Sequence, residues 1–304
     1  MFKTHFNRHA VSNSLSSIRH SLHDGKITLP PKNTTFVFLC GANISRNVVS
    51  TRRQAIIDFS RHALPHSSFF IAERALDVLQ KESHNENLID IEHRISQFAD
   101  YILIVLESPS AFTELGAFSS KELRDKLIVI NDSKHEDSTS FIHLGPLKAL
   151  KDAQGHSRVI YYPMAPDGIT YLDAVGETFA TLSALLPPRV RRSTRLPPSD
   201  ADPASHCTKS AALFLHDLIY IAGPIKHAEV IKLCRNVFDP DGSYNNVRIL
   251  LGILVAFDAV TRCTEGLYRS TRSEPYLKYN LDINSIVAQF RTLHLKNNPE
   301  RFYP

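Results

Sequence analysis

The residues with the clearest capacity for chemistry lie in one stretch, residues 98–119, which reads FADYILIVLESPSAFTELGAFS. Its apolar run, residues 101–106, is bounded by polar residues, and this pattern predicts a β-strand that is buried on both faces. Pro109 ends the strand because proline lacks the N–H of a ladder, and we expect a helix to begin one or two residues later. Glu114 then lies in the first or second turn of that helix. The pattern places a carboxylate at the carboxyl end of a buried parallel strand, where open α/β sheets bind ligands.

A carboxylate fixed at this place has a defined chemistry at a sugar carbon. An N-glycosidic bond breaks through an oxocarbenium-like state, and a carboxylate under C1′ either stabilises that charge or traps it covalently. We therefore treat Glu114 as a candidate catalytic residue. The alternative, from position alone, is a charge near the start of a helix that the helix dipole stabilises.

Three more polar residues of this region are candidates for contact with a substrate: Glu107, Ser108 and Asp100. Glu107 is a candidate for the acid that protonates the leaving base, and solvation of the turn explains it equally well. Asp100 begins the central strand, and a structural role at the strand start is the favoured alternative. Ser108 lies in the turn between the strand and the helix.

A second candidate region follows the first clear strand, residues 34–39. A glycine turn comes next, and Gly41 allows the backbone to approach a ligand closely. We expect backbone groups of this turn to hold a ribose or phosphate; the turn consists of Cys40, Gly41, Ala42 and Asn43. Neither G-x-G-x-x-G nor a Walker pattern is present. Downstream arginines offer charge to a phosphate or form a solvated helix face: Arg46, Arg52 and Arg53.

Residues 31–186 alternate between short apolar runs and stretches with helical spacing. Expected strands are 34–39, 68–71, 101–106, 127–130 and 158–162, and expected helices include 51–62, 73–80, 87–98, 147–151 and 169–186. Strands that alternate with helices predict an α/β domain with a doubly wound parallel sheet of about five strands.

Two segments flank this domain. Residues 1–30 form an N-terminal arm, in which residues 10–22 carry apolar side chains at helical spacing. We expect this helix to dock onto the first domain, and binding to a partner chain is the alternative. Residues 187–205 contain five prolines and four arginines with few core-forming residues, which is typical of a linker.

Residues 206–304 have a different character and predict a smaller, mainly α domain. Helices are expected at 208–222, 224–237 and 245–261, followed by extended runs at 265–268 and 275–279 and a last helix at 283–293. Three helices followed by a basic hairpin is the order of a winged helix. Arg248 would then lie near the start of the recognition helix, and Arg269 and Arg272 on the wing. Such a domain serves DNA binding or protein contacts equally well.

Composition narrows the class of protein. The chain has 304 residues, which suits two domains, and a net charge of +4. From Arg189 onward there are 16 Lys and Arg against 11 Asp and Glu, so the basic excess lies in the C-terminal third and permits an acidic partner such as nucleic acid. No run of 18 apolar residues and no secretory signal is evident, so we expect a cytoplasmic protein without membrane contact. No metal-binding motif is present, and no metal site is expected.

The segment 110–117 resembles the nucleoside 2-deoxyribosyltransferase family, which carries its nucleophilic glutamate in a Gly-Thr-Ala-x-Glu-x-Gly-Tyr-Ala segment after a buried strand. The resemblance implies that Glu114 is the nucleophile and that Gly116 follows it at the family spacing. Two positions depart from the family pattern. Ser108 stands where the family often has an aspartate for the base, and residues 38–42 replace an opening Tyr-Leu-Ala-Gly-Pro segment.

A broader resemblance covers nearly the whole chain. Its strongest blocks are residues 36–41, 104–109, 112–119, 126–128 and 140–142, which are similar to the effector proteins of bacterial retrons. Those effectors have a deoxyribosyltransferase-like domain followed by a winged-helix-like domain. The resemblance implies an antiphage toxin that is held inactive by the retron reverse transcriptase and its multicopy single-stranded DNA (msDNA), a DNA–RNA hybrid. Phage interference then releases the toxin, which halts growth of the host cell.

These observations favour an N-glycoside hydrolase that acts on a cellular nucleotide, with Glu114 at C1′. NAD is the favoured substrate because nicotinamide is a good leaving group, and purine nucleosides or nucleotides come next; no cofactor is expected. One alternative is a non-catalytic regulator that binds nucleotides with its first domain and DNA with its second. Another is a transferase that exchanges bases. The sequence leaves the oligomeric state open, including a homo-oligomer within the retron complex.

Overall fold

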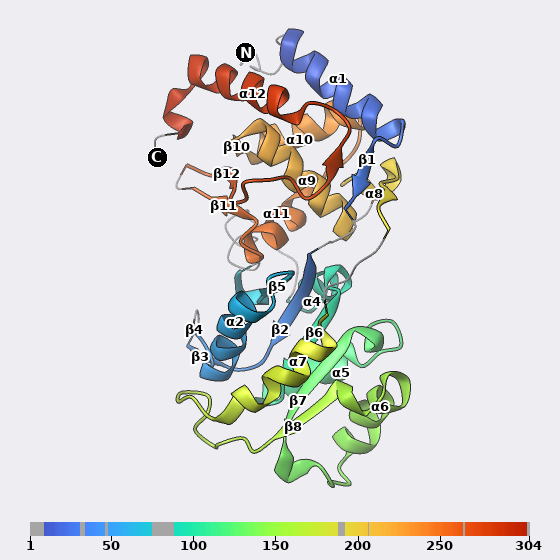
Figure 1. Ribbon diagram of the computed structural model, residues 1–304, viewed down its shortest axis with the longest axis vertical. Helices are drawn as coiled ribbons and strands as arrows, with labels where there is room; N and C mark the ends of the chain where they lie inside the picture. Colours follow the sequence, from blue (N-terminus) through green and yellow to red (C-terminus); the bar gives the residue numbers. More distant parts are fainter. Residues whose placement is uncertain are drawn as a thin grey trace. The chain divides into compact units, whose positions relative to one another are not determined.

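The computed structural model describes residues 9–30, 34–45, 48–74, 88–187, 192–205, 207–263 and 265–302. The chain divides into two compact units (Figure 1). One unit comprises residues 34–73 and 86–189. The other comprises residues 1–33, 74–85 and 190–304 and therefore includes both ends of the chain. The predicted helix at 73–80 lies mostly outside the described residues.

The first unit is built on a parallel sheet. In its described residues the sheet has five strands in the order β5-β2-β6-β7-β8. They are β5 (Ser67–Phe70), β2 (Thr35–Cys40), β6 (Tyr101–Val105), β7 (Leu127–Asp132) and β8 (Val159–Tyr162). All four pairings are parallel. The α/β fold class with a doubly wound parallel sheet is therefore confirmed.

Alternate residues of each strand pack against helices on opposite faces of the sheet. On one face Val37 and Leu103 belong to a core that α2 (Thr51–Ala63) and α7 (Phe179–Leu185) complete through Ile56 and Leu182. On the other face Phe36 packs against Phe98 of α4 (Leu88–Phe98), and Phe38 against Phe118 of α5 (Pro109–Phe118). Strands covered on both faces explain why the sequence shows continuous apolar runs.

Further elements complete this unit. They are the hairpin β3 (Asn43–Ser45) and β4 (Val48–Val49), the 3-10 turns η2 (Arg124–Lys126), η3 (Ser133–His135), η5 (His156–Arg158) and η6 (Ala174–Thr178), the π-helical turn η4 (His143–Leu147) and α6 (Lys148–Gln154). The prediction of a single long helix at 169–186 is wrong. Only η6 and α7 form there, because the Asp173 side chain accepts from Val175 N and starts a new turn.

The N-terminal helix α1 (His9–His23) belongs to the second unit. Its buried residues are the predicted stripe: Val11, Leu15, Ile18 and Leu22. The helix packs against α10 (His227–Val237) and α12 (Ile283–Asn297). The expectation that it docks onto the first domain is therefore wrong, because its apolar partners come from the C-terminal helices.

The segment predicted as a linker is partly structured where it is described. Within it, β9 (Thr194–Arg195) pairs with β1 (Ile27–Leu29), which also pairs with β13 (Lys278–Tyr279). The short helix α8 (Pro198–Ala201) packs against α9 (Lys209–Ala222), and both Leu196 and Ala201 are buried. Composition suggested a solvated chain, but backbone pairing and these few apolar side chains fix it to the C-terminal unit.

The C-terminal residues form the predicted order of three helices followed by a hairpin. The helices are α9, α10 and α11 (Asn246–Ala256), and the hairpin is β11 (Val260–Arg262) with β12 (Leu267–Ser270). A short strand between the first two helices, β10 (Ile225–Lys226), pairs with β12. The hairpin lies earlier than predicted, because residues 275–279 lead instead to β13 beside β1. A turn at Pro299–Phe302, η7, follows α12.

Candidate active site

The candidate site lies at the carboxyl edge of the parallel sheet. The strand order reverses between β2 and β6, and such a switch point is where doubly wound sheets bind ligands. Residues 40–43 comprise the end of β2, the turn at Gly41 and Ala42 and the start of β3. The segment after β6 contains Glu107, Ser108 and helix α5 with Glu114. The structure thus brings together the two candidate regions that the sequence singled out separately.

Glu114 is half-buried, and its Oε2 is a buried oxygen without a hydrogen-bond partner. Burial raises the pKa of Glu114 to about 8, the charge of Glu92 adds to the rise, and Arg53 acts in the opposite direction. The charge of Glu114 also helps burial to raise the pKa of the Cys40 thiol, which places the carboxylate near the end of β2. We interpret a buried carboxylate oxygen without a hydrogen-bond partner as a group that a ligand contacts.

Two other carboxylates share the environment of Glu114. Burial and the charge of Glu73 raise the pKa of Glu92, on α4, to about 7. Burial also acts to raise the pKa of Glu73, but the charge and hydrogen bonds of Arg53 hold it below the ordinary value. Acidic groups thus outnumber the single arginine in this set, which gives the site a preference for positive charge.

Arg53 organises the turn after β2. Its side chain is 1% exposed, and its Nη1 donates to Asn43 Oδ1 at 2.7 Å and to Glu73 Oε1 at 3.1 Å. Its Nη2 donates to the Leu39 carbonyl at 2.9 Å. The guanidinium therefore joins the end of β2, the turn and Glu73 in one buried set of contacts.

Position 41 requires glycine for two reasons, the conformation of its backbone and the lack of space for a side chain. Its φ is +154°, and a Cβ at this position would lie 2.9 Å from Glu107 Oε1 and 3.0 Å from Arg53 Cδ. The neighbouring Ala42 donates its N–H to Glu107 Oε1 at 3.0 Å. The glycine lets the turn lie directly against the two charged side chains that hold it.

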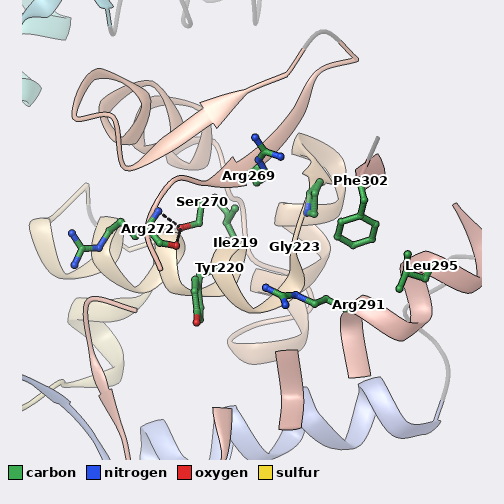
Figure 2. A pocket seen from close by; sticks show the side chains of 10 residues that line it. Ile219, Tyr220, Gly223, Arg269, Ser270, Arg272, Arg291, Leu295 and Phe302 are labelled. Carbon is green, nitrogen blue, oxygen red and sulfur yellow. Dashed lines mark hydrogen bonds between the residues drawn. The ribbon is translucent and has the colours of Figure 1, made fainter. Parts of the chain in front are cut away.

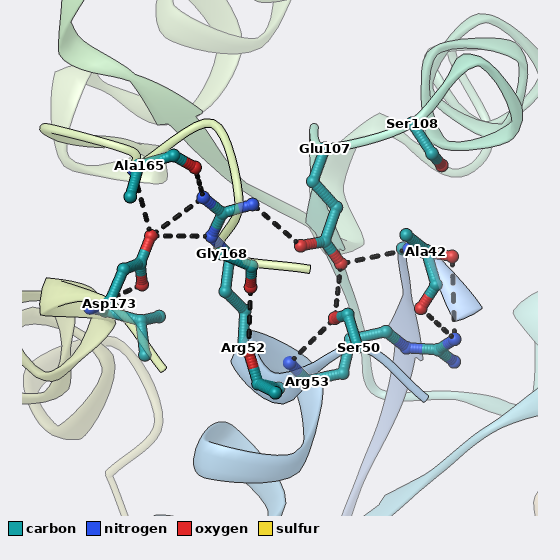
Figure 3. Close-up of polar contacts among 12 residues, drawn as sticks. Ala42, Ser50, Arg52, Arg53, Glu107, Ser108, Ala165, Gly168 and Asp173 are labelled. Atoms are coloured by element: carbon teal, nitrogen blue, oxygen red, sulfur yellow. Dashed lines mark hydrogen bonds and ion pairs between the residues drawn. The ribbon is translucent and has the colours of Figure 1, made fainter. Parts of the chain in front are cut away.

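Glu107 supports this turn from the β6 side (Figure 3). Its carboxylate is fully buried, accepts from Ser50 Oγ at 2.6 Å and pairs with Arg52 Nη1 at 3.1 Å. Its oxygens are therefore occupied by protein groups, and solvation of the turn does not explain it. The geometry favours a positioning role for Glu107; its contact with a substrate stays a prediction.

Arg52 connects the β6 segment to the loop after β8. Besides Glu107 it contacts Asp173, with Nε to Oδ2 at 2.8 Å, and Nη2 donates to the Ala165 carbonyl (Figure 3). Asp173 also accepts from Tyr162 Oη at 3.2 Å. One buried arginine on α2 thus ties together the loops that follow β6 and β8.

The sequence analysis did not identify these two arginines as structural residues. Arg52 and Arg53 were expected to meet a phosphate or solvent, whereas their side chains are 3% and 1% exposed and contact carboxylates. One local signal was available: Ser50 caps α2 by accepting from Arg53 N, which fixes where the two arginines point. Arg46 lies outside the described residues.

The remaining candidates of this domain have different positions. Ser108 is the N-cap of α5 and accepts from Ala111 N at 3.3 Å. Gly116 is exposed on α5, and an added Cβ would meet nothing within 4 Å. Asp100 accepts from Phe36 N at 2.9 Å at the amino edge of the sheet. This position favours the structural role at the strand start, and contact of Asp100 with a substrate stays a prediction.

The three arginines predicted to bind nucleic acid lie on different elements. Arg248 is half-buried on α11, a helix in which eight residues are buried, so little of it is free for a DNA groove. Arg269 lies on β12 rather than on the wing loop. Arg272 follows β12, and its guanidinium stacks on Tyr276 with 4.1 Å between the guanidinium carbon and the ring centre.

Two kinds of feature are absent from the described residues. They contain no helix that is both long and apolar enough to span a membrane. They also contain no group of three or more His, Cys, Asp or Glu side chains arranged to hold a metal ion.

The fold is that of a doubly wound α/β protein, and its switch point carries a cluster of acidic side chains that forms a candidate ligand site. The family model for the STM3845 retron effector protein matches residues 49–262, which is more than half of the chain. The chain belongs to this family of retron effector proteins.

Two relatives from Escherichia coli support this assignment. One is named "Retron Ec73 putative ribosyltransferase/DNA-binding protein" and is 39% identical over 299 residues, which cover 96% of this chain and 94% of the relative. The other is named "Retron Ec86 putative ribosyltransferase/DNA-binding protein" and is 36% identical over 116 residues, which cover 38% of this chain and 37% of the relative.

Proposed function

We propose that this retron effector is a toxin of an antiphage defence system and hydrolyses the N-glycosidic bond of a cellular nucleotide. NAD is the favoured substrate, and purine nucleotides come next. One observation carries the proposal: a half-buried glutamate at the switch point of the sheet has a carboxylate oxygen without a protein partner. Such a group is suited to act at C1′ of a bound nucleotide.

In the proposed reaction the bond between C1′ and the base nitrogen breaks, and its electron pair leaves with the base. The positive charge that develops at C1′ faces the ionised Glu114 carboxylate, which stabilises it or forms an ester with it. Water then adds its hydroxyl group to C1′ and releases a proton; where an ester has formed, its bond between C1′ and the Glu114 oxygen breaks and the carboxylate is regenerated. The products are the free base and a nucleotide fragment with a 1′-hydroxyl group.

The acidic surroundings support NAD over a neutral nucleoside. The nicotinamide ring carries a positive charge on the nitrogen bonded to C1′, so it leaves without being protonated. That charge next to Glu114 and Glu92 favours the ionised form of the carboxyls, whose pKa values of about 8 and about 7 are raised in the absence of substrate. A purine base needs a proton from a carboxylic acid in order to leave.

Control by the retron's own components would keep such a toxin inactive until a phage infects the cell. We propose that the reverse transcriptase and msDNA hold the chain inactive in the cytoplasm and that phage interference frees it. The basic excess of the C-terminal third supports a nucleic-acid partner for the three-helix and hairpin domain, which we interpret as winged-helix-like. Phosphate contacts of this kind weaken as salt rises.

The test uses the full chain, freed of its partners, and measures base released from NAD, ATP, dATP and the corresponding nucleosides. Release of a free base in buffer supports hydrolysis. Release that requires a second, acceptor base indicates a transferase instead. If no base is released from any of them and the chain still halts growth of cells, the proposal is wrong.

An experiment in cells distinguishes the hypothesis of a non-catalytic regulator from that of an enzyme. It predicts that Glu114→Gln leaves toxicity intact, whereas charge reversal at Arg248, Arg269 and Arg272 abolishes it. The hydrolase predicts that Glu114→Gln abolishes toxicity. Growth after induction of each variant distinguishes the two functions.

A further inference from the structure

The C-terminal unit contains a pocket that the chemistry at Glu114 does not use. It has a volume of about 380 Å³, within the range of roughly 300–1,000 Å³ that ligand pockets occupy. Its walls come from α9, β12, α12 and the turn that follows α12 (Figure 2). The side chains that matter for its chemistry are Tyr220, Arg269, Ser270, Arg291 and Phe302.

The pocket is positively charged. Arg269 on β12 and Arg291 on α12 are exposed and lie on two different walls, and neither forms an ion pair with a described residue. No acidic residue is among the described residues that line the pocket. By contrast, the neighbouring Arg301 is neutralised by Glu229 at 2.8 Å. Two unneutralised guanidinium groups at one pocket favour a phosphate, which they bind through paired N–H donors.

Aromatic and apolar side chains complete the lining. Figure 2 shows Arg291 extending from α12 toward Tyr220, with the Phe302 ring beside Gly223 and Leu295. The Tyr220 hydroxyl donates to the Ser273 carbonyl at 3.1 Å, which holds the ring at the pocket. Aromatic rings next to arginines are the combination on which unstacked nucleotide bases stack in single-strand binding sites.

A buried network holds the β12 wall in place. Ser270 Oγ lies 2.9 Å from His216 Nε2, and His216 Nδ1 lies 2.8 Å from Asp217 Oδ1. His216 and Asp217 are both fully buried, and Asp217 also accepts from the backbone N–H groups of Tyr276 and Leu277. The wall that carries Arg269 is therefore fixed from inside the domain rather than left as a mobile loop.

We propose that this pocket binds one nucleotide, with its phosphate between Arg269 and Arg291 and its base against Tyr220 and Phe302. The nucleotide comes either from solution or from the unpaired part of a single-stranded nucleic acid. This site, rather than the mostly buried helix α11, then provides the nucleic-acid contact of the domain. The proposal depends on the charge and shape of the pocket and does not require Glu114 to be catalytic.

The test measures binding of two probes to the full chain, deoxyadenosine 5′-monophosphate and a short single strand of oligodeoxythymidylate, by titration calorimetry or fluorescence. Arg269→Glu and Arg291→Glu should each weaken binding by about tenfold or more, because a charge-assisted contact is replaced by repulsion. The matched control is Arg235→Glu on the exposed side of α10, which makes the same charge change outside the pocket and should alter binding by less than about threefold.

A second pair of variants separates stacking from folding. Tyr220→Phe keeps the ring and should retain binding, whereas Tyr220→Ala removes it and should weaken binding by about tenfold. Circular dichroism and thermal melting check that each variant is folded.

Each outcome of these titrations either supports the proposed nucleotide site or overturns it. Binding of the mononucleotide identifies a free nucleotide as the source, and binding of the single strand alone identifies an unpaired nucleotide of a strand. Absence of binding to both probes overturns the proposal. So does equal loss in Arg235→Glu and Arg291→Glu, which would show a general charge effect. These results are independent of base release by Glu114→Gln, so this proposal and the proposed enzyme function fail separately.

Discussion

The proposed chemistry depends on how single carboxyl groups are placed. Glu114 and Glu107 are seven residues apart in sequence and have opposite environments: one has an oxygen without a protein partner, and the other is fully paired with Arg52, Ser50 and Ala42. This contrast supports our proposal that Glu114 reacts at the sugar and that Glu107 positions the turn. The sequence alone left both roles open because it does not show which carboxylate meets a buried arginine.

The raised pKa of Glu114 predicts a pH profile for the enzyme. If the ionised carboxylate acts at C1′, kcat/KM for base release should fall about tenfold for each pH unit below the pKa of about 8 and level off above it. The measurement is kcat/KM for nicotinamide release across a pH series. A profile that is flat through this range would contradict the ionised form as the active one.

The same group should also affect stability. The pKa of Glu114 rises from an ordinary 4.5 to about 8 on folding, so its contribution to stability is complete below about 4.5 and is lost as pH rises through about 8. Glu114→Gln has no such loss, and its Tm should exceed that of the wild type above about pH 8 but match it near about pH 4. Melting curves at the two pH values test this, and equal Tm values at both would contradict it.

The two glycines of the candidate site should respond in opposite ways. Gly41→Ala combines a positive φ with a clash against Glu107 and Arg53, and it should lower the free energy of unfolding by about 1–3 kcal/mol. Gly116→Ala is the matched variant, because its Cβ meets nothing and alanine favours a helix by up to about 1 kcal/mol. Urea denaturation of both variants checks this expectation. A Gly41→Ala protein as stable as wild type would show that the turn adjusts.

At the level of secondary structure, the strands were the most predictable elements. The apolar runs at 34–39, 101–106 and 127–130 correspond to β2, β6 and β7, because strands buried on both faces leave no polar position. The contacts of charged side chains on the helices were less predictable. Arg52 and Arg53 were candidates for a phosphate contact or a solvated helix face. Their actual partners, Glu107, Asp173 and Glu73, lie 20 to 121 residues away along the chain.

The loops of the site depend on the buried Arg52 contacts. Arg52→Met would leave the carboxylates of Glu107 and Asp173 buried without their cation, and it should lower the free energy of unfolding by about 3–5 kcal/mol. Arg61→Met on the same helix is the control, because its pair with Asp58 is exposed and should contribute at most about 1 kcal/mol. Denaturant titration compares the two, and equal effects would show that the buried pairs do not hold the loops.

Across the whole molecule, the two ends of the chain share one folding unit. The stripe of α1 correctly predicted docking, but the first domain was the wrong surface, since any apolar groove satisfies such a stripe. Ile18→Ala should lower the stability of the C-terminal unit by about 2–5 kcal/mol, because Ile18 is fully buried. Hydrogen exchange should then quicken in α10 and α12 while β6 and β7 keep their protection. Faster exchange in the parallel sheet instead would contradict this division of the chain.

The central claim is that the Glu114 carboxylate cleaves a nucleotide between sugar and base. Its most direct test is the rate of nicotinamide release from NAD by the wild type, Glu114→Gln and Glu122→Gln, measured side by side on folded protein. Glu122 is exposed beyond the end of α5, so its variant makes the same chemical change away from the site. We expect release by the wild type and Glu122→Gln and a loss of at least about a hundredfold in Glu114→Gln. Release at the wild-type rate by Glu114→Gln would contradict the account.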